Sequence, residues 1–371
     1  MKIISITTSL VRIALSSPYV ISRGMLDAFN NVVVEIKTDE GISGFGEAVP
    51  VSLLGDPVRF KAVIEERLTP HLIGRDPADI EALVDLCLLH CDGVIAAVAG
   101  VDLALWDVLG KALKVPVSTL LGGQCQREIL VDYTMSVDTP VAMAQRAREV
   151  SAAGFRGVVV KTDCKSIDID VERVRQVRAA LPPASTMRVD CNGGYSRESA
   201  FAFIERIADL GVEFVEQPVT AADLEGLKQC RGRGIRIAAD EALSTPQDAL
   251  RLVSAEACDV LNVKVPKAGG LLQSKRVAAI AAAANLPLVV GGGLTFGISR
   301  FASQHLAASS SQACGHCHEG PGPASQSLTD DVTSQRVTRQ DVTLNGGFVI
   351  ASRDAGLGFD IDRRLLAAYT V

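Results

Sequence analysis

The chain has 371 residues, more than one typical core requires, and its apolar share of 48 % is ordinary for a globular protein. Its net charge of −6, with no basic run, argues against a nucleic-acid partner. No run reaches the roughly 18 apolar residues of a membrane span, the N-terminus lacks a signal-peptide core, and the nine cysteines are too scattered for a disulfide framework. We therefore expect a cytoplasmic protein with reduced thiols.

The first part of the chain reads as a small antiparallel sheet followed by helices. The expected strands are Val11–Leu15, Asn31–Lys37 and Ile42–Glu47. Polar loops are expected at 16–30 and 48–57. From Arg59 to Lys114 apolar residues recur every three or four positions, which predicts helices. A domain boundary is expected near Gln124–Glu128.

From residue 129 the pattern becomes strand and then helix, repeatedly. Seven apolar strands are expected at Ile129–Met135, Gly157–Lys161, Met187–Cys191, Phe214–Glu216, Ile235–Asp240, Val260–Val265 and Pro287–Gly291. An eighth is expected near Gln312–Cys317. This pattern predicts an α/β fold in which a TIM-type β/α barrel, residues 126–341, carries an α+β capping domain made of residues 1–125 and completed by about 342–371.

Carboxylates close three consecutive barrel strands. Asp190, Glu216 and Asp240 follow one another at intervals of 26 and 24 residues, which is about the length of one β/α unit. Residues at the same phase of parallel strands lie on one rim, where three acids repel one another unless a cation neutralises them. A hard divalent ion with oxygen ligands is the usual solution, so we expect a Mg²⁺ site flanked by lysines such as Lys264.

With these residues in place, the sequence resembles the enolase superfamily, in its muconate lactonizing enzyme subgroup. The resemblance covers nearly the whole chain and rests on an ordered set of short motifs. They are Ala104–Asp107, Leu120–Gly123, Asp190–Gly194, Val215–Pro218, Ala239–Glu241, Asn262–Lys264, Gly269–Gly270, Leu328–Asp331 and Gly356–Gly358. Each motif alone is weak evidence, whereas the ordered set at this spacing is strong.

The resemblance implies roles for individual residues. Asp190, Glu216 and Asp240 would bind Mg²⁺, while Lys161 and Lys264 would face each other across a small-molecule carboxylate substrate. Behind the ligands, Asn192 is either a hydrogen-bonding partner or the start of a turn, and Glu241 either supports a ligand or pairs with a lysine. Substrate contacts are expected from Ser22, Arg23, Thr295 and His318. A homo-oligomer is also expected, because relatives form dimers and octamers.

The chain departs from the subgroup within the substrate pocket. The second strand usually carries Lys-x-Lys, but Val159 replaces the first lysine, which removes a neighbour that would lower the pKa of Lys161. The seventh strand often ends near an acid, but Gly291–Thr295 offers only a hydroxyl, and the eighth-strand region His316–Glu319 is unusual. These departures concern the substrate rather than the metal.

Lysines beside a metal-bound carboxylate permit proton transfer at the carbon α to that carboxylate, through a metal-stabilised enolate. We expect an isomerase, first a muconate-like cycloisomerase. The alternatives are an N-acylamino-acid or dipeptide racemase or epimerase, and an acid-sugar or hydroxy-acid dehydratase. The dehydratase is disfavoured because no histidine ends the seventh strand. A catalytically inactive metal-binding scaffold is the non-enzyme alternative, and the two lysines argue against it.

Overall fold

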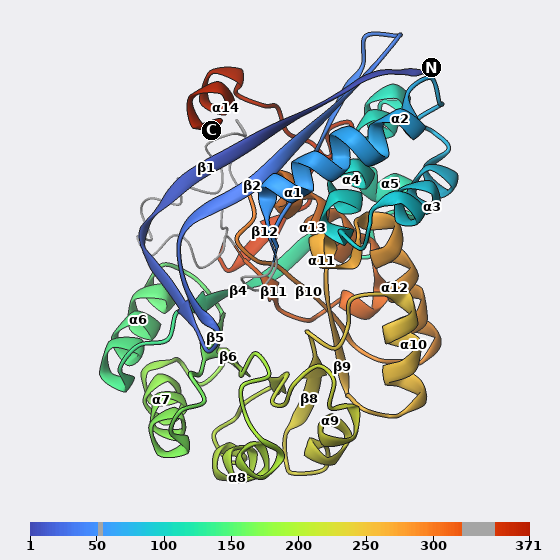
Figure 1. Cartoon of the computed structure of the whole chain (residues 1–371). Coiled ribbons are helices and arrows are strands. Elements are labelled where there is room, and N and C mark those ends of the chain that lie inside the picture. Colours follow the sequence, from blue (N-terminus) through green and yellow to red (C-terminus); the bar gives the residue numbers. More distant parts are fainter. Residues whose placement is uncertain (51–54, 321–345) are drawn as a thin grey trace.

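Two sheets organise the chain, a small antiparallel one at the N-terminus and a large curled one that begins at residue 128 (Figure 1). A computed structural model describes residues 1–50, 55–320 and 346–371. In the small sheet, β1 (Ile3–Ile21), β2 (Gly24–Thr38) and β3 (Ser43–Ala48) pair in the order β1-β2-β3. The hairpin of β1 and β2 extends from the N-terminal layer down to the rim of the large sheet (Figure 1).

The prediction of a polar loop at residues 16–30 is wrong, because strand pairing between β1 and β2 continues through most of this stretch. Only Ser22 and Arg23 form the turn between β1 and β2. The pairing shifts register between Ala14 and Tyr19. Pro18 lies in that irregularity, where its missing N–H costs no ladder hydrogen bond. A polar, proline-containing sequence therefore forms part of a long strand. Of the second expected loop, residues 51–54 lie outside the described residues.

Helices follow the small sheet, which confirms the helical prediction for residues 59–114, and α1, η1 and α4 pack against the sheet itself. They are α1 (Pro57–Ala62), the π-helical η1 (Val63–Leu68), α2 (Thr69–Leu72), α3 (Ile80–His90), α4 (Ile95–Leu113) and α5 (Val117–Leu120). Helix α4 lies directly on β3, since a Cβ built on Gly46 would fall 1.8 Å from the carbonyl oxygen of Gly100. Glycine at position 46 thus permits a helix–sheet contact that any side chain would block.

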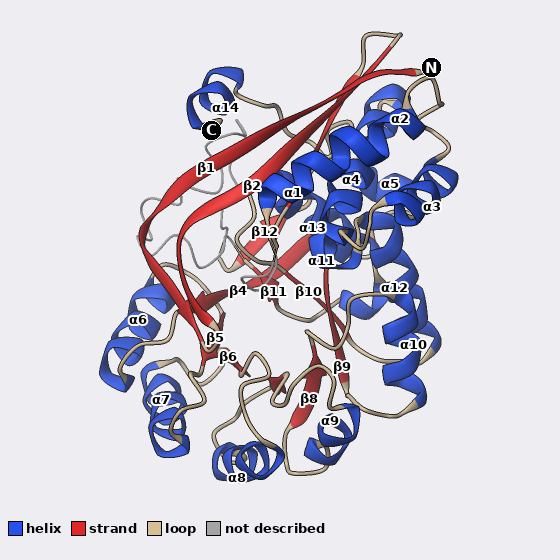
Figure 2. Ribbon diagram, in the orientation of Figure 1, coloured by secondary structure: helices blue, strands red, loops and turns tan. Residues whose placement is uncertain are grey.

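The large sheet confirms the predicted alternation of strands and helices. Its parallel strands are β4 (Glu128–Met135), β5 (Gly157–Lys161), β6 (Thr186–Asp190), β7 (Phe214–Glu216), β8 (Arg236–Ala239), β9 (Val260–Lys264), β10 (Leu288–Gly291) and β11 (His318–Glu319). The connecting helices are α6 (Pro140–Ala152), α7 (Ile167–Ala180), α8 (Arg197–Ile207), α9 (Leu224–Cys230), α10 (Pro246–Ser254), α11 (Val265–Ala268), α12 (Leu271–Ala283) and α13 (Gly297–Ser309). The helices surround the curled sheet, as in a TIM-type barrel (Figure 2).

The eighth strand is displaced from its predicted position. Residues 312–317 contain the end of a 3-10 turn, η2 (Ser311–Ala313), and β11 begins only at His318. The order of the sheet runs from β10 at one end to β11 at the other. The His318 ring spans these ends, since its Nδ1 accepts from the Val290 N–H at 3.0 Å and its Nε2 lies 3.0 Å from the Ala313 carbonyl oxygen. A side chain therefore links the two ends of the barrel sheet.

The C-terminal segment contacts both sheets. β12 (Phe348–Ile350) pairs antiparallel with β4, and α14 (Arg363–Tyr369) lies beside β1. Arg363 donates two hydrogen bonds to the carboxylate of Glu35 on β2, at 2.7 and 2.6 Å. The predicted boundary at 341–342 and the motif Leu328–Asp331 lie outside the described residues.

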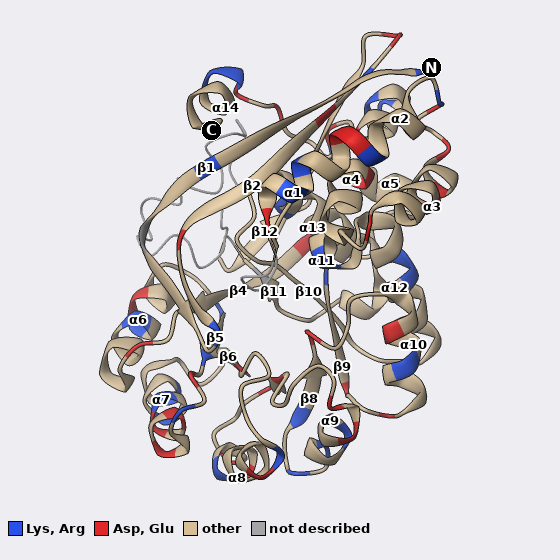
Figure 3. Cartoon of the chain, viewed as in Figure 1, with Lys and Arg blue, Asp and Glu red and all other residues tan. Residues whose placement is uncertain are grey.

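Charged residues of both signs lie on the outer helices, for example on α7 and α8 (Figure 3).

None of the helices in the described ranges is long and apolar enough to cross a membrane. All nine cysteines are free, as the sequence predicts.

Two buried acids of the N-terminal layer cap helices of the barrel. Asp102 on α4 accepts the N–H groups of Leu271 and Leu272, at 2.5 and 3.2 Å, where α12 begins after a glycine that has no side chain to offer. Glu47 on β3 accepts the N–H groups of Phe296 and Ser299 at the start of α13. An acid side chain at a helix N-terminus satisfies free backbone N–H groups. These contacts fix the N-terminal layer over the barrel.

Asp102 gives the first testable prediction. Burial raises the pKa of its carboxyl to about 7, although the bonds from Leu271 and Leu272 oppose that rise. The folded protein then keeps a proton that the unfolded chain loses near pH 4. We expect stability to fall as the pH rises from about 4 to 7, by at most about 4 kcal/mol. Urea unfolding of the wild type and of Asp102→Asn across this range measures the difference; parallel pH curves would contradict the prediction.

Candidate metal centre and active site

The three acids expected to form a metal site come together at one rim of the barrel. Asp190 and Glu216 end β6 and β7 as register partners, and Asp240 follows the last residue of β8. One carboxylate oxygen from each residue can be chosen so that all three lie within 4.8 Å of one another, and all three residues are buried. The equal phase predicted for consecutive strands is therefore the arrangement that the fold produces.

The electrostatics of this cluster fit a hard cation. Burial, and then the charges of Asp190 and Asp240, hold the pKa of Glu216 well above its ordinary value. Burial also acts against the charge of Asp240, but Lys264 and Lys267 lower its pKa overall. An all-oxygen set of three acids, in which Asp190 and Asp240 disfavour the charge of Glu216, matches the preference of Mg²⁺. The same three residues can hold such an ion.

Two buried lysines flank the acids from opposite sides. Lys161, at the end of β5, donates to Asp190 and, at 3.1 Å, to Oδ1 of Asn192. Lys264, at the end of β9, donates to Oδ2 of Asp240 at 2.6 Å. Burial by itself lowers the pKa of each lysine, but the neighbouring carboxylates, with Asp190 first for Lys161 and Asp240 first for Lys264, raise both overall. The lysines therefore serve as counter-ions to the acids in this arrangement.

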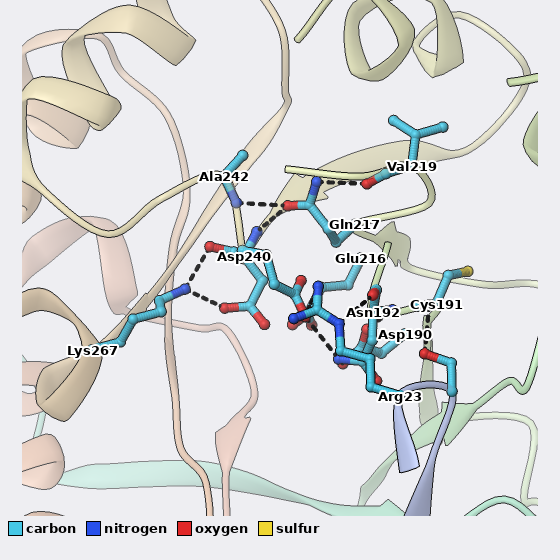
Figure 4. Close-up of polar contacts among 12 residues, drawn as sticks. Arg23, Asp190, Cys191, Asn192, Glu216, Gln217, Val219, Asp240, Ala242 and Lys267 are labelled. Atoms are coloured by element: carbon cyan, nitrogen blue, oxygen red, sulfur yellow. Dashed lines mark hydrogen bonds and ion pairs between the residues drawn. The ribbon is translucent and has the colours of Figure 1, made fainter. Parts of the chain in front are cut away.

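Two further residues brace the acids. Oε1 of Gln217 accepts the N–H groups of Asp240 and Ala242 at 3.1 and 3.0 Å, and its Nε2 donates to the Val219 carbonyl (Figure 4). Lys267 donates both to the backbone oxygen and to Oδ1 of Asp240 (Figure 4). Gln217 has a φ of +40°, a conformation that non-glycine residues rarely adopt. Gln217 belongs to the sequence motif Glu-Gln-Pro, but that motif does not predict the hydrogen bonds from the Asp240 and Ala242 N–H groups to its side chain.

The hairpin turn lies against the same rim. Ser22 donates to the Cys191 carbonyl at 3.3 Å. Arg23 donates to the Asn192 carbonyl at 3.0 Å (Figure 4). Arg23 also pairs with Glu241 at 3.4 Å, and the Asn192 amide donates to Glu241 at 3.2 Å. Asn192 and Glu241 thus connect the hairpin to the acids. The charge of Arg23 is therefore paired with Glu241, in the wall of the site.

A cavity of about 80 Å³ lies between the hairpin and the acids. Its apolar wall includes Tyr19, Ile21, Leu26, Val289 and Leu294, and its polar floor includes Lys161, Asp190, Glu216, Asn262 and Lys264. Thr295 and His318 instead line a second cavity of about 30 Å³ behind the glycine loop at 291–293. Both ring nitrogens of His318 are held by the backbone, so it contributes to barrel closure rather than to this substrate wall.

Comparison with known proteins agrees with this geometry. The mandelate racemase/muconate lactonizing enzyme N-terminal domain matches residues 3–122, and the enolase C-terminal domain-like family matches residues 142–365. The chain belongs to the mandelate racemase/muconate lactonizing enzyme family of the enolase superfamily.

Members of this family with different activities resemble the chain to a similar degree. The hydrophobic dipeptide epimerase of Enterococcus faecalis is 32% identical over 83% of this chain and 87% of its own length. The N-succinyl-L-Arg/Lys racemase of Bacillus cereus is 29% identical over 100% and 98%, and a chloromuconate cycloisomerase of Cupriavidus necator is 30% identical over 100% and 99%.

Solved structures of the same family share the fold. The Bacillus cereus racemase superposes with a TM-score of 0.93 at 28% identity, covering 100% of this chain and 98% of that one. The Enterococcus faecalis epimerase, in complex with Mg and the dipeptide L-Leu-L-Tyr, superposes with a TM-score of 0.89 at 29% identity, covering 97% and 99%.

Proposed function

We propose that the protein is a Mg²⁺-dependent racemase or epimerase that moves a proton at the carbon α to a carboxylate, with an N-acylamino acid or a dipeptide as substrate. The observation that carries this proposal is the pair of buried lysines, Lys161 and Lys264, on opposite sides of one carboxylate cluster. Inversion of a carbon needs a base on one face and an acid on the other, and this pair supplies one amine for each face.

Asp190, Glu216 and Asp240 would hold the ion. A bound divalent cation supplies stabilisation of the negative charge that develops on the substrate carboxylate. The side chains of this protein do the rest. The carboxylates that raise the pKa of both lysines are the ones that would hold the ion, so the bound ion would offset that rise. One lysine in its neutral form then takes the proton from the α-carbon, and the other in its ammonium form returns a proton to the opposite face. Gln217, Asn192 and Lys267 keep the acids in register, and the hairpin covers the site.

The lining of the cavity supports the substrate class. Above the acids the wall is apolar, with Tyr19, Ile21 and Leu26 from the hairpin and Val289 and Leu294 from the barrel. The cation Arg188 on β6, which also lines the cavity, is already paired with Asp132 at 2.8 Å. A substrate with one carboxylate and an apolar substituent suits this wall better than a muconate, which carries two carboxylates. The apolar lining of the cavity therefore favours a racemase or epimerase over the cycloisomerase that the sequence predicts first.

Proton exchange tests the proposal directly. The protein with Mg²⁺ in D₂O is incubated with hydrophobic N-acylamino acids, dipeptides, cis,cis-muconate and acid sugars, and NMR follows the α-proton. We expect loss of the α-proton signal and inversion for members of the first two classes, and none after removal of the metal with EDTA. Lactone formation from muconate without exchange in the other classes would support the cycloisomerase instead. An absence of reaction in every class would support the inactive scaffold.

A further inference from the structure

In the side-chain amide of Asn262 on β9, the nitrogen makes a hydrogen bond and the oxygen has no hydrogen-bond donor among the described residues. Its Nδ2 donates to Oε1 of Glu216 at 2.8 Å. In its ionised form, which a metal ligand takes, Glu216 only accepts hydrogen bonds, so this contact requires the amide nitrogen to face Glu216 and directs Oδ1 away from it. Asn262 is 3% exposed, and among the described residues nothing donates to Oδ1. A buried acceptor without a donor is costly, which points to a partner that arrives in another state of the site.

Lys264 is a flexible donor that borders the same space as this oxygen. A Cβ built on Gly291, the register partner of Lys264, would lie 2.4 Å from Oδ1 of Asn262 and 3.0 Å from Cε of Lys264. The amide oxygen and the last carbon of the lysine therefore border the same small space, which glycine leaves open. Solvent does not reach Oδ1. A rotation about the last bond of Lys264, rather than a substrate group, is the simplest way to supply a donor.

On the opposite side of the site, another asparagine lies between a carboxylate and a lysine, and there the hydrogen bond from the lysine to the amide oxygen is present. Asn192 donates from Nδ2 to Asp190 at 3.1 Å, and its Oδ1 accepts from Lys161 at 3.1 Å. Each lysine thus has an asparagine whose N–H binds a carboxylate of the cluster. The difference is that Lys264 donates to Asp240 instead, at 2.6 Å.

We propose that Asn262 is a positioning residue for Lys264. When a divalent cation occupies Asp240, the ammonium of Lys264 moves to Oδ1 of Asn262, which holds it against its face of the substrate as Asn192 holds Lys161. This inference rests on the proposed function, because it assigns the two asparagines to the two faces of one reaction.

Exchange from separate enantiomers is the kinetic test. Lys264→Ala first identifies the enantiomer from which Lys264 takes the proton. Asn262→Ala should then slow α-proton exchange from that enantiomer at least tenfold more than from the other, and the matched variant Asn192→Ala should show the reverse preference. A role only in holding Glu216 or the fold would slow both directions equally, and that result would overturn the inference.

Gly291→Ala provides a second variant if Asn262→Ala does not fold. Its methyl group would occupy the space between Oδ1 of Asn262 and Cε of Lys264, so the same enantiomer should be affected. Equal slowing of both directions would again contradict the inference.

A crystal structure of the wild-type protein with Mg²⁺ gives a readout that does not depend on turnover. We expect Nζ of Lys264 within hydrogen-bond distance of Oδ1 of Asn262. If the lysine still pairs with Asp240 while the metal is bound, the inference is wrong. If the wild type exchanges neither enantiomer of any tested substrate, the proposed function fails, and this structure alone decides the role of Asn262.

Discussion

Lys264→Ala and Lys161→Ala are each expected to lower the rate of racemisation or epimerisation by about a thousandfold or more, since positioned acid–base groups contribute roughly 10²- to 10⁴-fold each. Both lysines are needed for a complete inversion. One deprotonates and the other reprotonates, so loss of either interrupts the reaction in both directions. Polarimetry on a single enantiomer measures this loss.

The two lysine variants should differ in the partial reaction that remains. Each is expected to retain α-proton exchange from one enantiomer, because the remaining lysine still works on its own face, and the retained enantiomer should differ between them. Mg²⁺ binding should not weaken, since each lysine competes with the cation for a carboxylate. Lys165→Ala, a change at an exposed lysine, is the control and should leave the rate unchanged. Full activity in either site variant would remove that lysine from the mechanism.

The sequence predicted the elements whose signal is local and repeated. Seven barrel strands, from β4 to β10, lie within one residue of their expected positions, because apolar runs bounded by polar turns mark buried parallel strands. The acids were found for the same reason. Asp190, Glu216 and Asp240 occupy the same phase of successive units, and equal phase on parallel strands puts side chains on one rim.

Contacts between distant segments were beyond the sequence. The residues around Pro18 resemble a turn in sequence, but β1 pairs with β2 on both sides of them, up to Ala14 and again from Tyr19, so the hairpin continues through this stretch. His318 is expected to contact the substrate as a polar residue of the last barrel strand, but its ring instead links β10 to the Ala313 carbonyl. The bridge made by Gln217 and the idle oxygen of Asn262 depend on backbone positions in two strands, which no local motif encodes.

Glu216→Gln separates the metal role of the cluster from its role in folding. We expect the Mg²⁺ dissociation constant, measured by calorimetry, to rise on the order of 100-fold, because a neutral amide replaces the central one of three anionic ligands for a hard cation. Activity should fall with it at limiting metal.

Without metal the same variant should be more stable than the wild type. Burial and the charges of Asp190 and Asp240 disfavour ionised Glu216, so removing its charge is expected to raise the free energy of unfolding by about 1–3 kcal/mol. Asn262 can still donate to the oxygen of the new amide, which limits other changes. Chemical denaturation with EDTA and with excess Mg²⁺ measures both effects. The wild type should gain stability from the metal, and the variant should gain little. An unchanged dissociation constant would exclude Glu216 as a ligand, and a loss of metal-free stability would show that its charge is compensated within the protein.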